Sequence, residues 1–385
     1  MIERTAEKEL RNISKQYKAI AVVGPRQSGK TTLVRQVFAN KPYINLENPD
    51  VRSFALEDPK GFLNQYKEGA IFDEAQRAPQ LFSYLQQMLD ESKVLSKFII
   101  TGSNNFLLQQ SITQSLAGRV GYINLMPFSI SELGKAKPQN LLELMYKGFY
   151  PPLYDKDFEV GKWFSNYIRT YVERDVRQLK NIDNLLIFER FLRLCASRVG
   201  QLLNKNSLAI EVGVDNKTIE SWIGVLEASF IVYRLKPHHK NFNKRLVKMP
   251  KLYFYDVGLV CSLLGIQNPE QLDLHPLKGS LFENMVVMDV LKYRYNRGLS
   301  DNLYFWRNNT GNEIDLLLDN GINLLPLEIK MGHTVTKDYF KGIAYWNRLS
   351  DSKGGYVVYA GDEYQKRSNG IEVVSFHKIT EYLNN

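Results

Sequence analysis

A glycine-rich segment near the N-terminus has the residue types that bind a triphosphate. Gly24 to Thr31 follows the pattern G-x4-G-K-T. Its two glycines let the backbone N–H groups face phosphate oxygens, and the following helix directs its positive end at them. Lys30 is expected to reach the β and γ phosphates, and Thr31 to offer its hydroxyl to Mg²⁺. The residues expected to bind the nucleotide are Gly24, Pro25, Arg26, Gln27, Ser28, Gly29, Lys30, Thr31 and Thr32.

Two adjacent acids supply the second half of such a site. Residues 69–74 read Gly-Ala-Ile-Phe-Asp-Glu, a short apolar strand that ends in Asp73 and Glu74. Asp73 is expected to hold Mg²⁺ through water, and Glu74 to polarise the attacking water as a general base. Another strand candidate, 43–46, lies between the two motifs. This spacing indicates an inserted strand and the ATPase branch rather than a small kinase.

Polar residues further along are candidates for the transition state. Residues 97–104 form a third apolar strand that ends in Ser103 and Asn104. Either side chain could bridge the γ phosphate and the attacking water, and the alternative is an ordinary turn. Arg119 follows a helix-like segment and precedes a last strand. It could stabilise transition-state charge, in its own chain or from a neighbouring one, and the alternative is a helix C-terminal cap.

The motifs GPRQSGKTTL, IFDEAQ, ITGSNN and LAGR followed by LMPFSISEL resemble a widespread prokaryotic family of AAA-type ATPases. Members of that family carry a C-terminal domain of unknown function. Segments 171–179, 226–235, 252–265 and 279–287 resemble its tail, so the resemblance covers essentially the whole chain. It implies ATP rather than GTP as the nucleotide.

The elements that hold these residues are expected to form an α/β fold. Apolar residues 19–23 suit a buried strand, and apolar residues at helical spacing follow the P-loop. A chain of 385 residues is too long for one ordinary core. Three domains are predicted: an AAA-type ATPase core with a parallel sheet over 1–135, a helical and winged-helix module over 136–265, and a second α/β domain over 266–385.

Composition and charge narrow the class further. With 44% hydrophobic and 24% charged residues, the chain is globular rather than disordered. No apolar run approaches the roughly 20 residues of a membrane span, and the charged N-terminal segment is no signal peptide. Cys195 and Cys261 lack metal-ligand spacing, which fits two core thiols in a reduced, cytoplasmic interior.

Most of the net charge of +9 is concentrated in the middle of the chain. Residues 161–250 contain 16 Lys and Arg against 8 Asp and Glu, a balance of 16 − 8 = +8. Such asymmetry favours a polyanionic partner, with nucleic acid first among the candidates. The alternative is a set of solvated basic helix surfaces.

The spacing in this basic segment predicts a helix-turn-helix. Ala209 lies inside the first helix, Gly213 in the turn, and Ile219 packs the second helix, which Asp215 caps. Two strand candidates follow, joined by the basic run 236–248, as in a winged helix. The second helix would enter the major groove of DNA and the wing would contact phosphate. Alternatively, the module packs against the ATPase core.

Near the C-terminus, residues 306–332 read as a β hairpin with a turn at Asn320-Gly321. The second strand ends in an acid-x-lysine pattern, an acid lies on the first strand, and another acid lies upstream on a helix-like run. The set resembles the PD-(D/E)xK nuclease fold, although isoleucine replaces the usual proline. The resemblance implies Mg²⁺ or Mn²⁺ bound by the acids and a lysine beside the nucleophile. The residues are Glu283, Asp315, Glu328 and Lys330.

Two functions remain open. In the first, an ATP-driven DNA-binding protein repositions its winged helix and nuclease-like domain. In the second, a switch ATPase has a protein-interaction tail and an inactive nuclease-like domain. A stand-alone nuclease is less favoured, because it would leave the P-loop without a task. A homo-oligomer is compatible with either function, and no membrane partner is expected.

Overall fold

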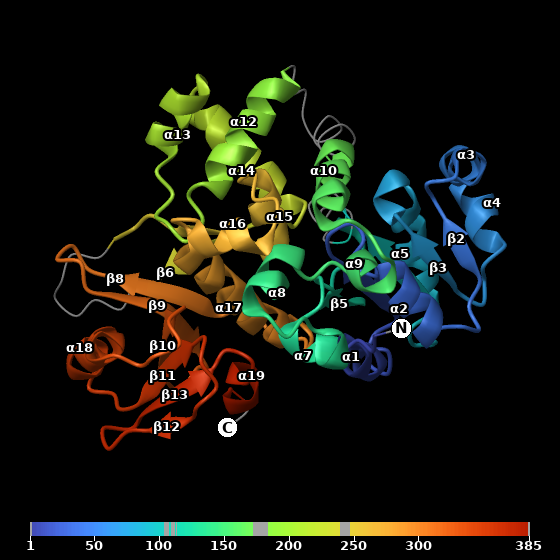
Figure 1. Cartoon of the computed structure of the whole chain (residues 1–385). Helices are drawn as coiled ribbons and strands as arrows, with labels where there is room; N and C mark the ends of the chain where they lie inside the picture. Colours follow the sequence, from blue (N-terminus) through green and yellow to red (C-terminus); the bar gives the residue numbers. More distant parts are fainter. Residues whose placement is uncertain are drawn as a thin grey trace.

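The computed structural model describes residues 2–103, 108, 112, 114–171, 184–238 and 247–383. Its first part is a parallel sheet of five strands in the order β2-β3-β4-β1-β5 (Figure 1). Strand β1 lies between β4 and β5, and β3 lies two places from β1. The strand expected over 43–46 is present as β2 beside β3, and the strand inserted between β1 and β3 is β4. The strands are β1 (Ala19–Val23), β2 (Tyr43–Asn45), β3 (Ala70–Asp73), β4 (Phe98–Gly102) and β5 (Val120–Asn124).

Helices cover both faces of this sheet, because alternate apolar residues of each buried strand point to opposite sides. Ile20 and Val22 of β1 pack with Leu10 of α1 and Leu33 of α2. The opposite face packs against α4 and α5 and continues into the core of the middle of the chain. These helices are α1 (Ala6–Ile13), α2 (Lys30–Val37), α3 (Pro49–Glu57), α4 (Pro59–Asn64), η1 (Ala75–Arg77) and α5 (Leu81–Glu91).

The middle of the chain is helical and contains the predicted helix-turn-helix. Gly213 joins α13 to α14 with φ +85°, and the Asp215 side chain caps α14 by accepting from the Thr218 N–H at 2.7 Å. The helices are α7 (Ile130–Leu133), η2 (Gly134–Ala136), α8 (Leu141–Lys147), α9 (Pro152–Asp155), α10 (Val160–Tyr171), α12 (Leu185–Ala196), α13 (Lys205–Val212), α14 (Asn216–Ala228), α15 (Val257–Leu263) and α16 (Pro269–Leu274).

Two strands follow α14 and join the middle of the chain to its C-terminal part. Strands β6 (Val232–Pro237) and β7 (Lys251–Phe254) pair antiparallel, as expected for a wing. The end of β6 also pairs in parallel with β8, at Lys236 with Tyr304 and Pro237 with Phe305. One sheet therefore crosses the domain boundary predicted at residue 265. Most of the predicted wing loop, 239–246, lies outside the described residues, as does 172–183.

The C-terminal sheet has eight strands in the order β12-β13-β11-β10-β9-β8-β6-β7. The predicted hairpin is present, with Leu324 opposite Asp319. Helix α17 packs on one face of this sheet, and α18 covers a small core around Trp306 and Trp346 on the other. The elements are α17 (Lys278–Tyr295), β8 (Leu303–Arg307), β9 (Glu313–Asp319), β10 (Leu324–Lys330), η4 (Lys337–Phe340), α18 (Lys341–Ser350), β11 (Gly355–Tyr359), β12 (Gln365–Lys366), β13 (Ile371–Ser375) and α19 (Ile379–Tyr382).

Candidate functional site

The P-loop connects the carboxyl end of β1 to the N-terminus of α2. Gly24, Gln27 and Gly29 have φ of +156°, +61° and +93°. Glycine suits two of these positions because L side chains rarely adopt such conformations. A Cβ on Gly24 would also lie 2.0 Å from the Leu125 carbonyl oxygen, so only glycine fits between the loop and the end of β5.

The predicted lysine, threonine and aspartate converge at this loop. The Lys30 ammonium donates to the carbonyls of Gly24 and Pro25 at 2.9 and 2.7 Å. The Thr31 hydroxyl donates to Asp73 Oδ2 at 2.9 Å. Thr31 and Asp73 thus provide hydroxyl and carboxylate oxygens at one point, which is the ligand chemistry that Mg²⁺ prefers.

Asp73 is held by more hydroxyl groups than the sequence indicated. Tyr43 on β2 donates to Asp73 Oδ2 at 2.5 Å, and Thr101 on β4 donates to Oδ1. Burial and then the hydrogen bond to Asp73 raise the pKa of Tyr43 well above its usual value, so it remains a donor. Tyr43 and Thr101 lie on the two strands that pair with β3, and no local sequence motif marks either residue.

Glu74 follows Asp73 in a left-handed conformation, with φ +53° and ψ +44°. This uncommon conformation for a non-glycine residue turns its side chain to a different position from that of Asp73. The Ser103 hydroxyl donates to Glu74 Oε2 at 2.9 Å. Ser103 therefore lies beside the candidate base. Asn104, the other candidate, lies outside the described residues.

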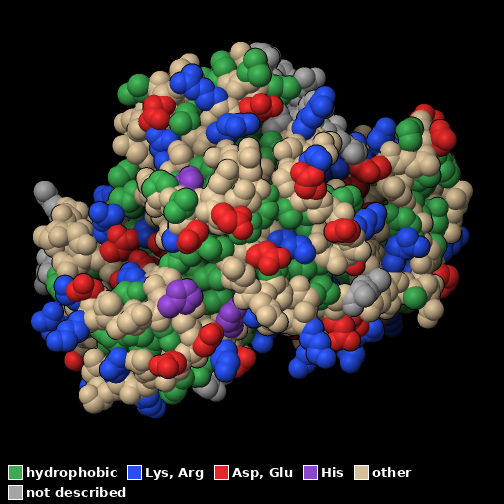
Figure 2. All heavy atoms as spheres, viewed as in Figure 1, with side chains coloured by type: hydrophobic (Ala, Val, Ile, Leu, Met, Phe, Trp, Pro, Cys, Tyr) green, Lys and Arg blue, Asp and Glu red, His purple; other side chains and the backbone are tan. Residues whose placement is uncertain are grey.

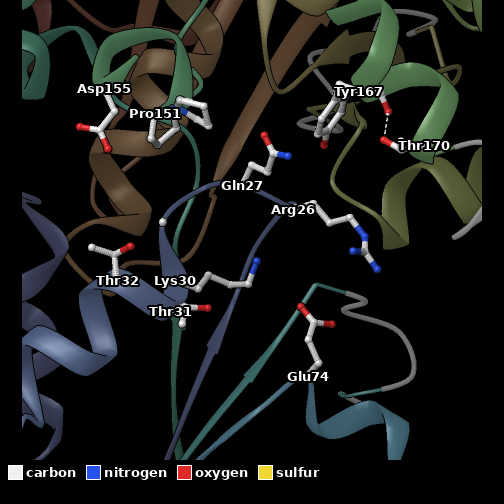
Figure 3. A pocket seen from close by; sticks show the side chains of 12 residues that line it. Arg26, Gln27, Lys30, Thr31, Thr32, Glu74, Pro151, Asp155, Tyr167 and Thr170 are labelled. Carbon is white, nitrogen blue, oxygen red and sulfur yellow. Dashed lines mark hydrogen bonds between the residues drawn. The ribbon is translucent and has the colours of Figure 1, made fainter. Parts of the chain in front are cut away.

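A cavity of about 530 Å³ lies in front of the P-loop (Figure 3). Arg26, Lys30 and Glu74 point into it from the sheet side. The opposite wall comes from α9 and α10, outside the predicted ATPase core, and sequence reasoning missed it because no motif marks these positions. Its residues are Pro151, Pro152, Asp155, Tyr167 and Thr170.

The residues present fit a magnesium-bound nucleotide. The N-terminus of α2 and the positive-φ loop present backbone N–H groups to an anion. The Ser28 hydroxyl is buried without a hydrogen-bond partner in the described part of the chain, so the loop retains an unused donor. Thr31 and Asp73 would hold the metal.

Arg119 does not lie at this site. It immediately precedes β5, whereas the P-loop follows the carboxyl end of the parallel strand β1. A five-residue strand spans roughly 16 Å. The guanidinium forms a two-pronged ion pair with Asp90 and donates to the Ala117 carbonyl at 3.0 Å. The prediction that Arg119 acts on the nucleotide of its own chain is therefore wrong, while its action on a neighbouring chain stays a prediction.

Many basic residues of the middle module pair within the chain. Arg198 pairs with Glu211, and Glu220 on α14 accepts from Lys205 at 3.0 Å and from Arg234 at 2.8 Å. On the face in Figure 2, Lys and Arg side chains are interspersed with Asp and Glu. Glu211 and Glu220 are already counted in the balance of residues 161–250, so these pairs leave the excess of +8 unchanged and occupy only some of the basic side chains.

The C-terminal acids are brought together in two groups. Lys330 contacts Asp315 at 3.2 Å and Glu328 at 3.0 Å. Burial and the nearby charge of Asp315 raise the pKa of Glu328 to about 8. Glu328 Oε2 is buried and has no hydrogen-bond partner in the part of the chain that the structure describes.

Glu283 is instead engaged by β7. Lys251, whose side chain is 4% exposed, contacts Glu283 at 3.0 Å and Glu313 at 2.5 Å, and Tyr253 donates to Glu283 at 2.5 Å. Burial alone would lower the pKa of Lys251, but neighbouring Tyr253 and acids raise it well above its usual value. Within the described ranges, no three acidic, histidine or cysteine side chains form a group able to hold a metal ion. Asp315, Glu328 and Lys330 are thus brought together as predicted, Glu283 is paired with Lys251, and the binding of a metal by this set stays a prediction.

The five-stranded parallel sheet and its P-loop define the N-terminal part as a P-loop ATPase of the AAA type. An AAA domain model matches residues 16–134, and models for two domains of unknown function match 138–270 (DUF8612) and 278–379 (DUF4143). The chain is 31% identical over 336 residues to an uncharacterized protein of Mycobacterium tuberculosis, covering 86% of this chain and 74% of the relative. It therefore belongs to the family of AAA-type ATPases with a C-terminal domain of unknown function, as the sequence motifs indicated.

Other similarities are more distant. A Haemophilus influenzae uncharacterized protein is 25% identical over 309 residues, covering 71% of this chain and 74% of the relative. Among solved structures, a Walker-type ATPase of Pyrococcus abyssi is 14% identical with a TM-score of 0.46, covering 67% of this chain and 94% of that one. AMPPCP-bound DnaA of Aquifex aeolicus is 14% identical with a TM-score of 0.30, covering 58% and 85%.

The described helices include none with the length and apolar character of a membrane span.

Proposed function

We propose that the protein binds and hydrolyses ATP with Mg²⁺ at the P-loop, and that the bound nucleotide controls a DNA-binding middle module. The cavity carries this proposal. Its walls are the phosphate-binding loop on one side and α9 and α10 on the other, so a nucleotide in it contacts both parts of the chain (Figure 3).

The chain's own groups divide the work of hydrolysis. Backbone N–H groups of the loop and the Lys30 ammonium bind the phosphates, and Thr31 and Asp73 position the metal. Mg²⁺ supplies neutralisation of charge on the phosphate oxygens. Glu74 orients and polarises the attacking water as general base, with Ser103 holding one of its oxygens at 2.9 Å.

DNA is proposed as the partner because of the helix-turn-helix and the basic segment that contains it. Asn216 and Lys217 are exposed on the first turn of α14, where such helices contact base edges. Contacts of the basic side chains with phosphate would make this binding salt-dependent, since they displace counterions from the DNA.

A titration of ATPase activity with DNA tests the proposal. At low salt, single-stranded or duplex DNA is expected to raise the ATPase rate of the parent protein. Lys217→Glu should weaken this stimulation but leave the rate without DNA unchanged. Lys162→Glu is a matched control, because Lys162 is also exposed but lies on α10 and pairs with Glu159. Unchanged hydrolysis at every DNA concentration would refute the DNA part of the proposal.

The pairing of Glu283 with the buried Lys251 favours a second candidate, in which the tail is an inactive nuclease-like domain that binds a protein partner. Incubation with supercoiled and branched DNA plus Mg²⁺ or Mn²⁺, beside Lys330→Ala, separates the two. Cleavage by the parent and not by the variant would reject this candidate. No cleavage by either protein, with a protein recovered in a pull-down that depends on nucleotide, would support it.

A further inference from the structure

The guanidinium of Arg4 lies directly behind the P-loop. It donates to the Ser28 carbonyl at 2.6 Å and to the Met126 carbonyl at 2.7 Å. Its third contact is an ion pair with Glu132 at 3.1 Å, where the two side chains are 8% and 1% exposed. A Cβ on Gly29 would lie 3.4 Å from Arg4 Nη1. Arg4 thus joins the loop to the segment that leaves β5.

This contact determines the direction of one peptide group in the loop. The Ser28 C=O and the Gly29 N–H belong to the same planar trans peptide and point in opposite directions. Because Arg4 binds the carbonyl from behind, the Gly29 N–H is directed away from Arg4. Gly29 lines the nucleotide cavity, so this N–H is available for a phosphate oxygen.

Glu132 holds Arg4 in place from the motif LMPFSISEL, whose role the proposed function leaves unexplained. Its carboxylate also accepts from the backbone N–H groups of Thr5 at 2.8 Å and Ser129 at 2.9 Å. A guanidinium with three fixed acceptors has little freedom to turn.

Helix α17 contacts the same segment, 126–132. Lys292 donates to the Phe128 carbonyl at 3.0 Å, and Asp289 accepts from the Ile130 N–H at 2.7 Å. Both side chains are buried, at 2% and 3% exposure. Buried charges of this kind are weak sources of stability, and fixing one register between elements is a better-supported role for them. Helix α17 also carries Glu283 of the C-terminal cluster.

We infer that Arg4 is a positioning residue for ATP binding and that, through segment 126–132, it couples the P-loop to α17 and the C-terminal domain. The inference rests on the proposed binding of ATP at the P-loop. ATP and Arg4 stabilise the same orientation of the Ser28–Gly29 peptide, so bound ATP stabilises the arrangement in which Arg4, Glu132 and segment 126–132 hold α17 in one register. By reciprocity, a change on α17 alters the affinity for ATP.

The positioning role of Arg4 is tested by calorimetric titration of ATP with Mg²⁺ into Arg4→Met, Arg4→Lys and the parent protein. Arg4→Met should raise the Kd for ATP by about ten-fold or more, and Arg4→Lys by less, because lysine keeps the charge but loses the fork. The kcat at saturating ATP should remain close to that of the parent. Arg11→Met is the matched control, since Arg11 is exposed on α1 and pairs only locally with Glu7.

The coupling between α17 and the P-loop is tested by one substitution on α17 and one in segment 126–132. Asp289→Asn and, independently, Glu132→Gln should each raise the Kd for ATP by about five-fold or more, within the usual range of coupling. Asp338→Asn, an exposed change on η4 whose side chain pairs locally with Lys341, should have no effect. Kd values equal to the parent's in both variants would overturn the coupling, and an unchanged Kd in Arg4→Met would overturn the positioning role. If the parent itself takes up no nucleotide, the proposed function fails instead.

Discussion

At the residue scale, the proposed roles of metal binding and base catalysis belong to two adjacent acids that are held differently. Asp73 accepts hydrogen bonds from Thr31, Tyr43 and Thr101, which hold it in one orientation. Glu74 is turned away by its left-handed backbone and contacts Ser103. The strained conformation places a carboxylate at the cavity wall, where water can approach the phosphate chain.

This division predicts different effects for two substitutions. Glu74→Gln should retain ATP binding and lower kcat by about 10² to 10⁴, the usual contribution of a general base. Lys30→Ala should abolish tight binding, because the β and γ phosphates lose their cation. Calorimetry and a steady-state ATPase assay distinguish the two outcomes. Equal turnover in Glu74→Gln and the parent would remove Glu74 from the mechanism.

At the scale of elements, strand β7 links the middle module to the C-terminal acids. Lys251 on this strand is almost fully buried and pairs with Glu283 on α17 and Glu313 on β9. Three elements therefore depend on one ammonium group. The ammonium offsets the cost of burying these two carboxylates, together with Tyr253 at Glu283 and Arg307 at Glu313.

Lys251→Met should lower the free energy of unfolding by about 3 kcal/mol, the usual cost of breaking a buried pair. The double variant Lys251→Met, Glu283→Gln should recover part of this loss in the free energy of unfolding, because it lacks the uncompensated charge of Glu283. Chemical denaturation monitored by circular dichroism measures both. Lys236→Met, an exposed change on the neighbouring strand β6, is the control. A loss in Lys251→Met no larger than in this control would show that the network contributes little.

At the scale of the whole molecule, residues far apart in sequence meet where the middle module contacts the C-terminal part. Lys137 and the His377 Nδ1 lie 2.9 Å apart, 240 positions apart in the chain. Burial, and then the charge of Lys137, lower the pKa of His377 to about 4. The folded state therefore favours neutral histidine, whereas the unfolded chain protonates it near pH 6.5.

This pKa shift predicts a loss of stability in mild acid. The contribution of neutral His377 to the free energy of unfolding is fully present above pH 6.5. It is lost as the pH falls from 6.5 towards 4, because the unfolded chain takes up a proton on His377 before the folded protein does. His377 is only half buried, so solvent screening limits the effect to about 1 kcal/mol. His377→Gln should flatten the pH dependence of the unfolding midpoint between pH 7 and 4, while His275→Gln should not. Identical curves for His377→Gln and the parent would contradict this account.

Several features followed directly from local sequence patterns. The P-loop, the strand ending in Asp73 and Glu74, the helix-turn-helix at Gly213 and the hairpin at Asn320-Gly321 each depend on residues close together in the chain. Glycine conformations, strand periodicity and helix caps are local properties, so they are visible without a fold. The burial of Cys195 and Cys261 was also correctly predicted.

The amino-acid sequence by itself thus determined the class of the protein and the presence of its P-loop, because both depend on residues close together in the chain. Only the tertiary structure decided which residues from distant parts of the chain contact these local motifs. It placed Arg119 at the far end of the sheet, brought α9 and α10 to the cavity, set Arg4 behind the P-loop, and paired Glu283 with Lys251. The contacts of Arg4 alone join residues that are between 24 and 128 positions apart in the chain. Such contacts follow from how whole elements pack, and no local pattern records them.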